Sequence, residues 1–357
     1  MKSSSVELLK KLSEADGPSG YEKEARAVVF EYLKNLGAIS SDRLGSLICK
    51  KAKTETAPVV MLAAHMDEIG FMVKYITEDG FVRFLPLGGW FSQVLPAKRV
   101  KVKTAKGDVI GIIGSKPPHL MTIEEAKKLL RPEDLFIDIG ASSKKEAEKF
   151  GVKVGDPIVP VAEFMPLKNK KLLLGKAFDN RAGCAVMIKV MEELKTQENP
   201  NSIYAVASAQ EEVGLRGGRT STFMIAPDVA IILECRIAND FPGTEKPELY
   251  SCLGKGALIT FHDAGMIPNL KLRNLAVKTA REENIPYQAY VAGTGSTDAN
   301  VVHQSRSGVP AIVIGVPTRY FHSHAAVINL DDFEAAVRLV TALILRLDGK
   351  TVAGFHQ

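Results

Sequence analysis

Apolar residues occur along the chain in two alternating patterns, short continuous runs and stretches with helical spacing. The run Val59–Ala64 is apolar throughout, as expected of a strand buried on both faces of a sheet. Further strands are predicted at Ser46–Cys49, Ser202–Ala209, Val229–Leu233, Tyr287–Val291 and Ala311–Gly315. Helices are predicted at Val6–Asp16, Asp179–Lys195, Thr220–Ile225, Leu270–Asn284, Asp298–Ser305 and Asp331–Leu347. This alternation indicates an α/β fold with a mostly parallel, helix-covered sheet.

A different pattern occupies residues 71–163, where short β-type segments alternate with turn signals. One helical piece is predicted within it, at Ile123–Leu130. We therefore expect an α/β domain formed by residues 1–70 and 164–357, with a small β-rich domain of residues 71–163 inserted into it. The turn signals are Glu78-Asp79-Gly80, Gly88-Gly89, Lys106-Gly107-Asp108 and Ser115-Lys116-Pro117-Pro118.

Two local signals predict helix starts. Ser19 and Glu22 have the spacing of a capping box, which predicts a helix that continues to about Leu36. Asp298 follows a glycine-rich loop, Gly293–Thr297, and we expect it to cap the next helix. A phosphate-binding loop is the weaker interpretation of the same residues.

Composition narrows the class of protein. The 357 residues carry 46 Lys and Arg against 41 Asp and Glu, a net charge of +5 without a block of like charges. This favours neither nucleic acid nor a membrane surface as a partner. The four cysteines have no C-x-x-C spacing, so we expect reduced thiols. No apolar run reaches membrane-span length, and the start of the chain lacks a signal-peptide pattern. We expect a cytoplasmic protein.

Residues capable of chemistry follow the ends of the predicted strands, and one more, Asp179, precedes a helix N-terminus, where the helix dipole favours an anion. The carboxyl ends of parallel strands meet at one edge of a sheet, where ligands bind. Any one such histidine or acid is more often structural, but so many at one edge indicate a functional site. The candidates are His65, Asp67, Asp179, Glu211, Glu212, Glu234 and His322.

Nitrogen and oxygen ligands without thiolate suit zinc, cobalt or manganese. Two divalent cations carry a charge of +4, which Asp179, Glu212 and Glu234 balance together with one hydroxide. A short aspartate at a fixed turn is the natural bridge between paired ions. Successive residues of an extended strand face opposite ways, so we expect Glu211 and Glu212 to have different tasks, with Glu212 counted among the metal ligands.

Four segments resemble the tetrahedral (TET-type) metallo-aminopeptidases, a family that includes glutamyl and deblocking aminopeptidases and members labelled endoglucanase or cellulase M. The resemblance spans the whole chain and implies a zinc-exopeptidase-like catalytic domain. The segments are Ala63–Gly70, Gly175–Gly183, Gln210–Gly217 and Arg319–His324.

The resemblance implies a role for each candidate. Asp179 bridges two metals, of which His65 and Glu234 hold one and Glu212 and His322 hold the other. Glu211 is implied as the general base, and Asp67 as the residue that orients His65. Position 234 is usually Asp in the family, and the extra methylene of Glu234 leaves the geometry of its metal open. Cys235 is the other conceivable ligand, but in a strand its side chain points to the opposite face.

The resemblance further implies removal of the N-terminal residue from short peptides, and twelve subunits assembled from dimers through the inserted domain. A related two-metal carboxypeptidase or deacylase is the main alternative. A glycoside hydrolase would use Glu211 and Glu212 as paired acids, but it gives no role to the histidines or to Asp179. A metal-binding scaffold without activity is a third reading. We expect His119 to be a surface residue and His324 to have a structural role near the site.

Overall fold

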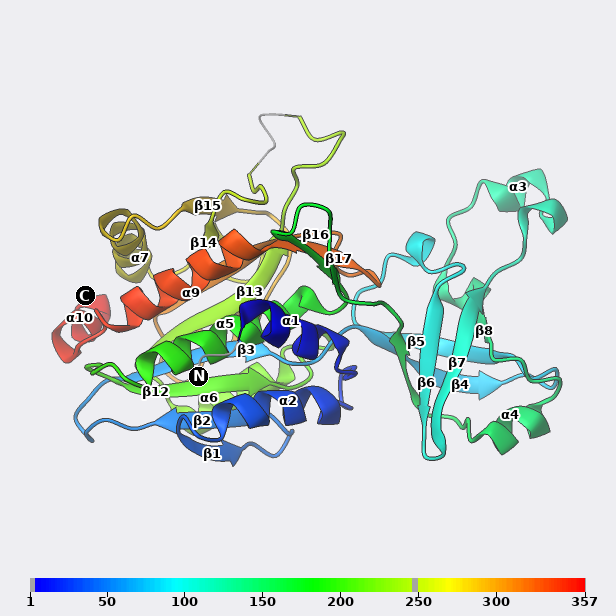
Figure 1. Cartoon of the computed structure of the whole chain (residues 1–357), viewed down its shortest axis with the longest axis horizontal. Coiled ribbons are helices and arrows are strands. Elements are labelled where there is room, and N and C mark those ends of the chain that lie inside the picture. Colours follow the sequence, from blue (N-terminus) through cyan, green and yellow to red (C-terminus); the bar gives the residue numbers. More distant parts are fainter. Residues whose placement is uncertain (1–3, 246–249, 357) are drawn as a thin grey trace.

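The computed structural model describes residues 4–245 and 250–356, which form a large helix-covered sheet and a smaller closed barrel beside it (Figure 1). Residues 1–3, which belong to the N-terminal segment without a signal-peptide pattern, lie outside the described residues. In the described part of the chain the sheet has 11 strands. They are β1 (Ala38–Ser41), β2 (Leu47–Lys51), β3 (Val59–His65), β10 (Met165–Pro166), β11 (Leu172–Gly175), β12 (Ser202–Ser208), β13 (Val229–Ile237), β14 (Ala257–His262), β15 (Tyr287–Val291), β16 (Ala311–Arg319) and β17 (Ala326–Asn329).

The centre of the sheet is parallel, in the order β12, β3, β13, β16. Successive residues of β3 enter different cores, because side chains alternate across a strand. Leu62 and Ala64 pack in one hydrophobic cluster, whereas Met61 and Ala63 pack in another on the opposite face. Both faces are therefore buried, which explains the unbroken apolar run and confirms the predicted α/β class.

Helices cover both faces of this sheet. Helix α5 packs against β3 and β13, with α1 and α9 beside it, while α6 and α8 pack on the other face. The helices are α1 (Ser5–Glu14), α2 (Lys23–Leu33), α5 (Phe178–Leu194), α6 (Arg216–Ile225), α7 (Leu270–Glu282), α8 (Ala299–Val302), α9 (Leu330–Ile344) and α10 (Gly349–Ala353). Among the described residues, no helix is long and apolar enough to cross a bilayer.

The barrel closes in the order β4-β5-β8-β7-β6-β9 around its own apolar core, which includes Phe71, Val100 and Ile158. The chain enters it immediately after the segment that carries His65 and Asp67. Its strands are β4 (Gly70–Ile76), β5 (Val82–Leu87), β6 (Arg99–Thr104), β7 (Gly107–Gly114), β8 (Phe136–Asp138) and β9 (Pro157–Pro160). Two short helices, α3 (Ile123–Ala126) and α4 (Lys144–Phe150), accompany them.

The predicted capping box at the start of α2 is wrong. The helix begins at Lys23 without a side-chain cap. Ser19 Oγ instead donates to a carboxylate oxygen of Asp67 at 2.6 Å. The Glu22 carboxylate accepts the Gly20 N–H at 2.7 Å. Both side chains are buried, and each has a partner distant in sequence, Asp67 for Ser19 and the Gln210 N–H for Glu22.

Candidate metal centre

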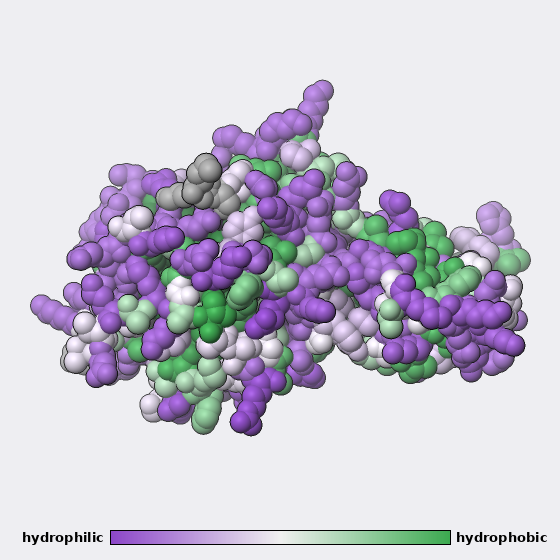
Figure 2. All heavy atoms as spheres, turned by 60° about the horizontal axis from the view of Figure 1, so that its bottom comes forward, coloured by the Kyte–Doolittle hydropathy of each residue, from purple (hydrophilic) through white to green (hydrophobic). Residues whose placement is uncertain are grey.

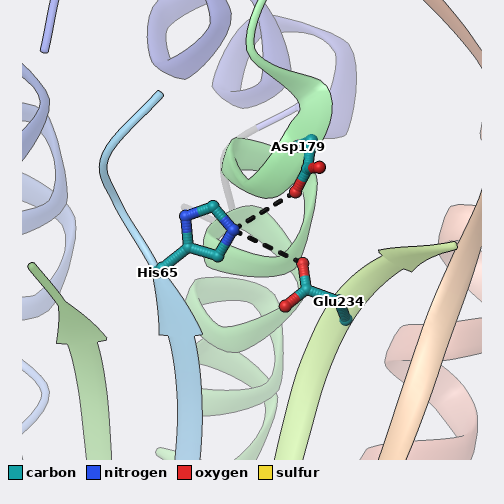
Figure 3. Close-up of side chains that lie close together, drawn as sticks. All are labelled: His65, Asp179 and Glu234. Carbon is teal, nitrogen blue, oxygen red and sulfur yellow. Dashed lines mark hydrogen bonds and ion pairs between the residues drawn. The ribbon is translucent and has the colours of Figure 1, made fainter. Parts of the chain in front are cut away.

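His65 is the last residue of β3, and its side chain is only 2% exposed. Its Nδ1 lies 3.1 Å from the backbone carbonyl oxygen of Asp67. A proton on Nδ1, donated to this carbonyl, leaves the Nε2 lone pair free for a metal. Nε2 faces Asp179 and Glu234, which approach from α5 and β13 (Figure 3).

Asp179 lies where α5 starts, and its own backbone is not helical, with φ −78° and ψ 105°. Asn180 caps the regular helix, because its Oδ1 accepts the Gly183 N–H at 3.1 Å. The carboxylate of Asp179 is therefore not used as a helix cap and can face the two histidines. Its Oδ1 lies 3.2 Å from His65 Nε2, and its Oδ2 lies 3.3 Å from His322 Nε2. One carboxylate stands between the two histidines.

Glu211 and Glu212 lie in the turn between β12 and α6, so the expectation that they face opposite ways as strand residues is wrong in its premise. They nevertheless approach different histidines. Glu212 Oε2 is 3.4 Å from His322 Nε2, and Glu211 Oε2 is 3.8 Å from His65 Nε2. The turn, not strand alternation, separates the two carboxylates.

Glu234 stands inside β13 and not at its end, because the strand continues to Ile237. Its Oε1 lies 3.6 Å from His65 Nε2 and also accepts the backbone N–H of Cys235 at 3.0 Å. The longer side chain therefore folds back on its own strand. Cys235 Sγ lies 3.0 Å from the carbonyl oxygen of Phe178 in α5, and Cys235 belongs to neither group of candidate ligands in the described structure.

His322 belongs to the loop between β16 and β17 and has a positive φ of 56°. Its side chain is 37% exposed. A glycine of the barrel approaches it closely, since a Cβ on Gly89 would lie 3.0 Å from His322 Nδ1. A Cβ on Gly88 would lie 3.2 Å from Glu212 Oε2. The barrel loop thus covers this side of the site.

The side chains form two groups of three that share Asp179. Within each group the ligand atoms lie within 4.8 Å of one another. Both groups open into a cavity of about 540 Å³, lined beyond them by residues that include Leu215, Tyr290 and Phe321. The inner group is His65, Asp179 and Glu234, and the outer group is Asp179, Glu212 and His322.

Charge crowding shifts the pKa values of the site. Burial would lower the pKa of His65, but the carboxylates of Glu211, Glu234 and Asp179 outweigh it and hold the pKa well above its usual value. Burial likewise opposes the effect of Asp179 and Glu212 on His322, whose pKa is raised to about 9.

The carboxyl groups show the same crowding. Burial, reinforced by Asp179, raises the pKa of Glu212 to about 7 and that of Glu234 well above its usual value. Burial and the neighbouring carboxylates raise the pKa of Glu211 well above its usual value. The pKa of Asp179 is lowered, because its two histidine partners outweigh its burial.

This donor set fits divalent metal ions. Four carboxylates, with side chains no more than 11% exposed, crowd two histidines, and Glu212 Oε1 is buried without a hydrogen-bond partner in the described structure. An orphaned carboxylate oxygen in such a cluster is explained by a cation. Imidazole and carboxylate ligands without thiolate suit zinc, cobalt or manganese.

Three other residues singled out in the sequence lie outside both groups. Asp298 precedes α8, but its side chain makes no cap hydrogen bond and accepts one from Ser208 Oγ. Its expected capping role is therefore wrong. His324 is partly exposed, and burial lowers its pKa. His119 is exposed in the barrel.

Ser19 and Glu22 were not predicted from the sequence to lie beside the site. Ser19 bonds to Asp67, whose carboxylate also accepts the backbone N–H groups of Glu211 and Glu212 at 3.0 and 3.1 Å. Glu22 accepts the Gln210 N–H at 3.1 Å. Only the serine–glutamate spacing marked these residues, and it predicted a local cap.

A sheet with a parallel centre, and two histidines and four carboxylates gathered around one cavity beside it, is typical of a metal-dependent hydrolase. The chain belongs to the M42 glutamyl aminopeptidase family, whose sequence profile matches residues 45–339. It is therefore a metallo-aminopeptidase of a family that uses divalent metal, as the resemblance of its sequence motifs predicted.

Three relatives illustrate the similarity. Glutamyl aminopeptidase of Lactococcus lactis is 37% identical over 97% of both chains. The TET aminopeptidase of Thaumarchaeota archaeon SCGC AB-539-E09 is 46% identical with a TM-score of 0.96, over 98% of both chains. The TET1 peptidase of Pyrococcus horikoshii, which can assemble into a tetrahedron or a large octahedral shell, is 32% identical with a TM-score of 0.86, over 96% of this chain and 100% of that chain.

Proposed function

We propose that the chain removes N-terminal residues from short peptides, with one divalent cation in the inner group and one in the outer group. The observation that carries this proposal is the position of Asp179, whose two oxygens lie 3.2 and 3.3 Å from different histidines. A carboxylate placed in this way can serve both ions. Zinc, cobalt or manganese ions held by these two groups would lower the pKa of a bound water and polarise the scissile carbonyl group.

Glu211 is the general base in this proposal. It belongs to neither ligand group, and its side chain is only 9% exposed at the cavity. Its raised pKa suits a carboxylate that takes a proton from water and passes it to the leaving amine. Asp67 supports this arrangement, because it contacts His65 and binds the backbone of Glu211 and Glu212.

Glu211→Gln tests the base. The substitution keeps the size of the side chain, so we expect both ions to remain bound while kcat falls by roughly 10²–10⁴-fold. Turnover of aminoacyl chromogenic substrates and metal content should be measured together, with zinc, cobalt and manganese. The exposed Glu14→Gln is the matched control. Wild-type turnover by metal-loaded Glu211→Gln would disprove the assignment.

The same substrates separate the alternatives. An aminopeptidase cleaves peptides with a free N-terminus, whereas a carboxypeptidase or deacylase accepts N-blocked ones. A chelator should abolish the activity, and zinc or cobalt should restore it. Cellulase activity that resists the chelator would favour a glycoside hydrolase instead.

We propose a homo-oligomer of twelve chains, built from dimers through the barrel. Hydrophobic side chains are exposed in the segment that forms the barrel, among them Phe91, Leu120, Ile123 and Leu129 at 62–77% exposure. Figure 2 shows apolar surface on the barrel from one side. Apolar side chains gathered in this way favour a subunit contact, and the Pyrococcus horikoshii relative forms a shell. A solution mass equal to one chain at assay concentration would contradict this assembly.

We place the enzyme in the cytoplasm. All four cysteines are free thiols in the described structure, and three of them are buried. Free thiols are typical of a reducing compartment.

A further inference from the structure

The turn before Glu211 is bound through its backbone amides to buried side chains from distant segments. The N–H of Ala209 donates to Ser46 Oγ at 3.2 Å, and the N–H of Gln210 donates to Glu22 Oε1 at 3.1 Å. Ser46 is fully buried, and Glu22 is 7% exposed. These two acceptors lie far from the turn in sequence.

The next two amides continue the series. The N–H groups of Glu211 and Glu212 donate to the two carboxylate oxygens of Asp67, at 3.0 and 3.1 Å. Ser19 Oγ donates to the same carboxylate at 2.6 Å. Four consecutive amides, from residue 209 to residue 212, are thus bound by side-chain oxygens. We call Ser46, Glu22 and Asp67 the amide clamp.

The turn needs such support. Gln210 has a φ of +56°, a conformation unfavourable for residues other than glycine and stable only where the surroundings enforce it. On its carbonyl side, the turn is held by α6, whose Gly217 N–H donates to Ala209 O at 2.9 Å. On its amide side, the support at Gln210 is Glu22. The backbone direction at this residue sets where the Glu211 side chain starts.

Glu22 stands at the N-cap position of α2, but its side chain makes no cap hydrogen bond to that helix. Burying a carboxylate is unfavourable unless hydrogen bonds compensate. Its Oε1 receives two backbone N–H groups, from Gly20 at 2.7 Å and from Gln210 at 3.1 Å. It therefore ties the loop before α2 to the residue that precedes Glu211.

We propose that Glu22 is a positioning residue for Glu211 and acts through the backbone amide of Gln210, with Ser46 as a weaker support. The inference rests on the proposed role of Glu211 as the base. Neither Glu22 nor Ser46 belongs to a ligand group. Loss of Glu22 should therefore affect proton transfer more than metal binding.

Glu22→Ala and Glu22→Gln form the test pair. A glutamine oxygen still accepts both amides, so Glu22→Gln should keep kcat within about 3-fold of wild type. In Glu22→Ala, displacement of the base by a fraction of an ångström should lower kcat roughly 10- to 100-fold. KM and the zinc affinity measured by calorimetry should change by less than about 3-fold. The exposed Glu31→Ala, on the same helix, is the control.

Unfolding temperature is measured for each variant, because a purely structural role would lower it without a selective loss of kcat. If Glu22→Ala does not fold, Glu22→Asp takes its place, since the shorter carboxylate keeps the charge but does not reach both amides. Ser46→Ala should lower kcat about 3- to 10-fold by the same route.

Glu211→Gln is assayed in parallel. If it retains wild-type turnover, the proposed base is wrong. If Glu211→Gln is inactive while the folded Glu22 variant keeps wild-type kcat, the role of Glu22 is overturned. Loss of zinc affinity in Glu22→Ala as large as its loss of kcat would also overturn it, because Glu22 would then act through the metal ligands.

Discussion

The two ligand groups share Asp179 but are built in different ways. In the inner group, His65 and Glu234 come from the adjacent parallel strands β3 and β13, with side chains 2% and 4% exposed. In the outer group, Glu212 and His322 come from connecting segments, and His322 is 37% exposed. The inner group is positioned by the sheet, whereas the outer group depends on two turns.

The barrel contributes to the difference. Its loop at Gly88 and Gly89 lies against Glu212 and His322. A Cβ on Gly88 would lie 3.2 Å from Glu212 Oε2, and a Cβ on Gly89 would lie 3.0 Å from His322 Nδ1. In the described structure, the close contacts of these two glycines reach the outer group and not the inner one. We therefore expect metal binding at the outer site to depend on the position of the barrel loop, while the inner site depends on β3, β13 and the start of α5.

The largest difference between the inner and the outer group should appear when the histidine of each group is removed. His322→Ala should leave one ion per chain in the inner group, whereas His65→Ala removes the ligand that the sheet holds most rigidly. We expect kcat/KM to fall at least roughly 100-fold in both, as several kcal/mol of charge stabilisation are lost. Calorimetric titration with zinc should give one tight site for His322→Ala and weaker binding for His65→Ala. Equal zinc affinities in the two variants would show that the inner and outer groups do not differ in this way.

Much of this arrangement could be predicted from the sequence. The apolar runs before His65 and Glu211 marked strands buried on both faces, and parallel strands bring such ends together. The position of Glu234 was harder, because β13 continues for three residues beyond it to Ile237. No change in apolar pattern marks where that strand passes the site.

The amide clamp and the barrel contact could not be predicted. Glu22 and Gln210 are 188 residues apart, and the Ser19–Glu22 spacing has a local meaning as a capping box, which competes with its tertiary use. Likewise, Gly88-Gly89 predicted a turn, but not which side chains that turn would approach. Local patterns give the elements, whereas these contacts depend on how the elements pack.

Gly89→Ala should have a smaller and more selective effect. The new methyl group would stand 3.0 Å from His322 Nδ1 and 3.4 Å from Cε1, so the ring must shift by a few tenths of an ångström. We expect roughly 10-fold weaker zinc binding at the outer site, as for other disturbed supports of a ligand, with the inner site unchanged. Gly293→Ala, where a Cβ would meet nothing within 4 Å, is the control. Weakening of both sites would mean that the groups are not independent.

The smallest effect should appear in the metal-free protein as a dependence of stability on pH. His322, with its pKa raised to about 9, holds a proton in the folded state that the unfolded chain releases near pH 6.5. The stability that protonated His322 contributes through its carboxylate partners is therefore fully present below about pH 6.5, and it is lost as the pH rises through about 9. Glu212, with its pKa raised to about 7, acts with the same sign at lower pH.

Unfolding temperature of the chelator-treated protein should thus fall between pH 6.5 and 9, and less steeply in His322→Gln. The change is modest because solvent reaches the 37% exposed imidazole and screens its ion pairs. Excess zinc should reverse the trend, since cations displace the same protons and bind more tightly as the pH rises. An unchanged slope in His322→Gln would show that His322 is not the group that titrates over this pH range.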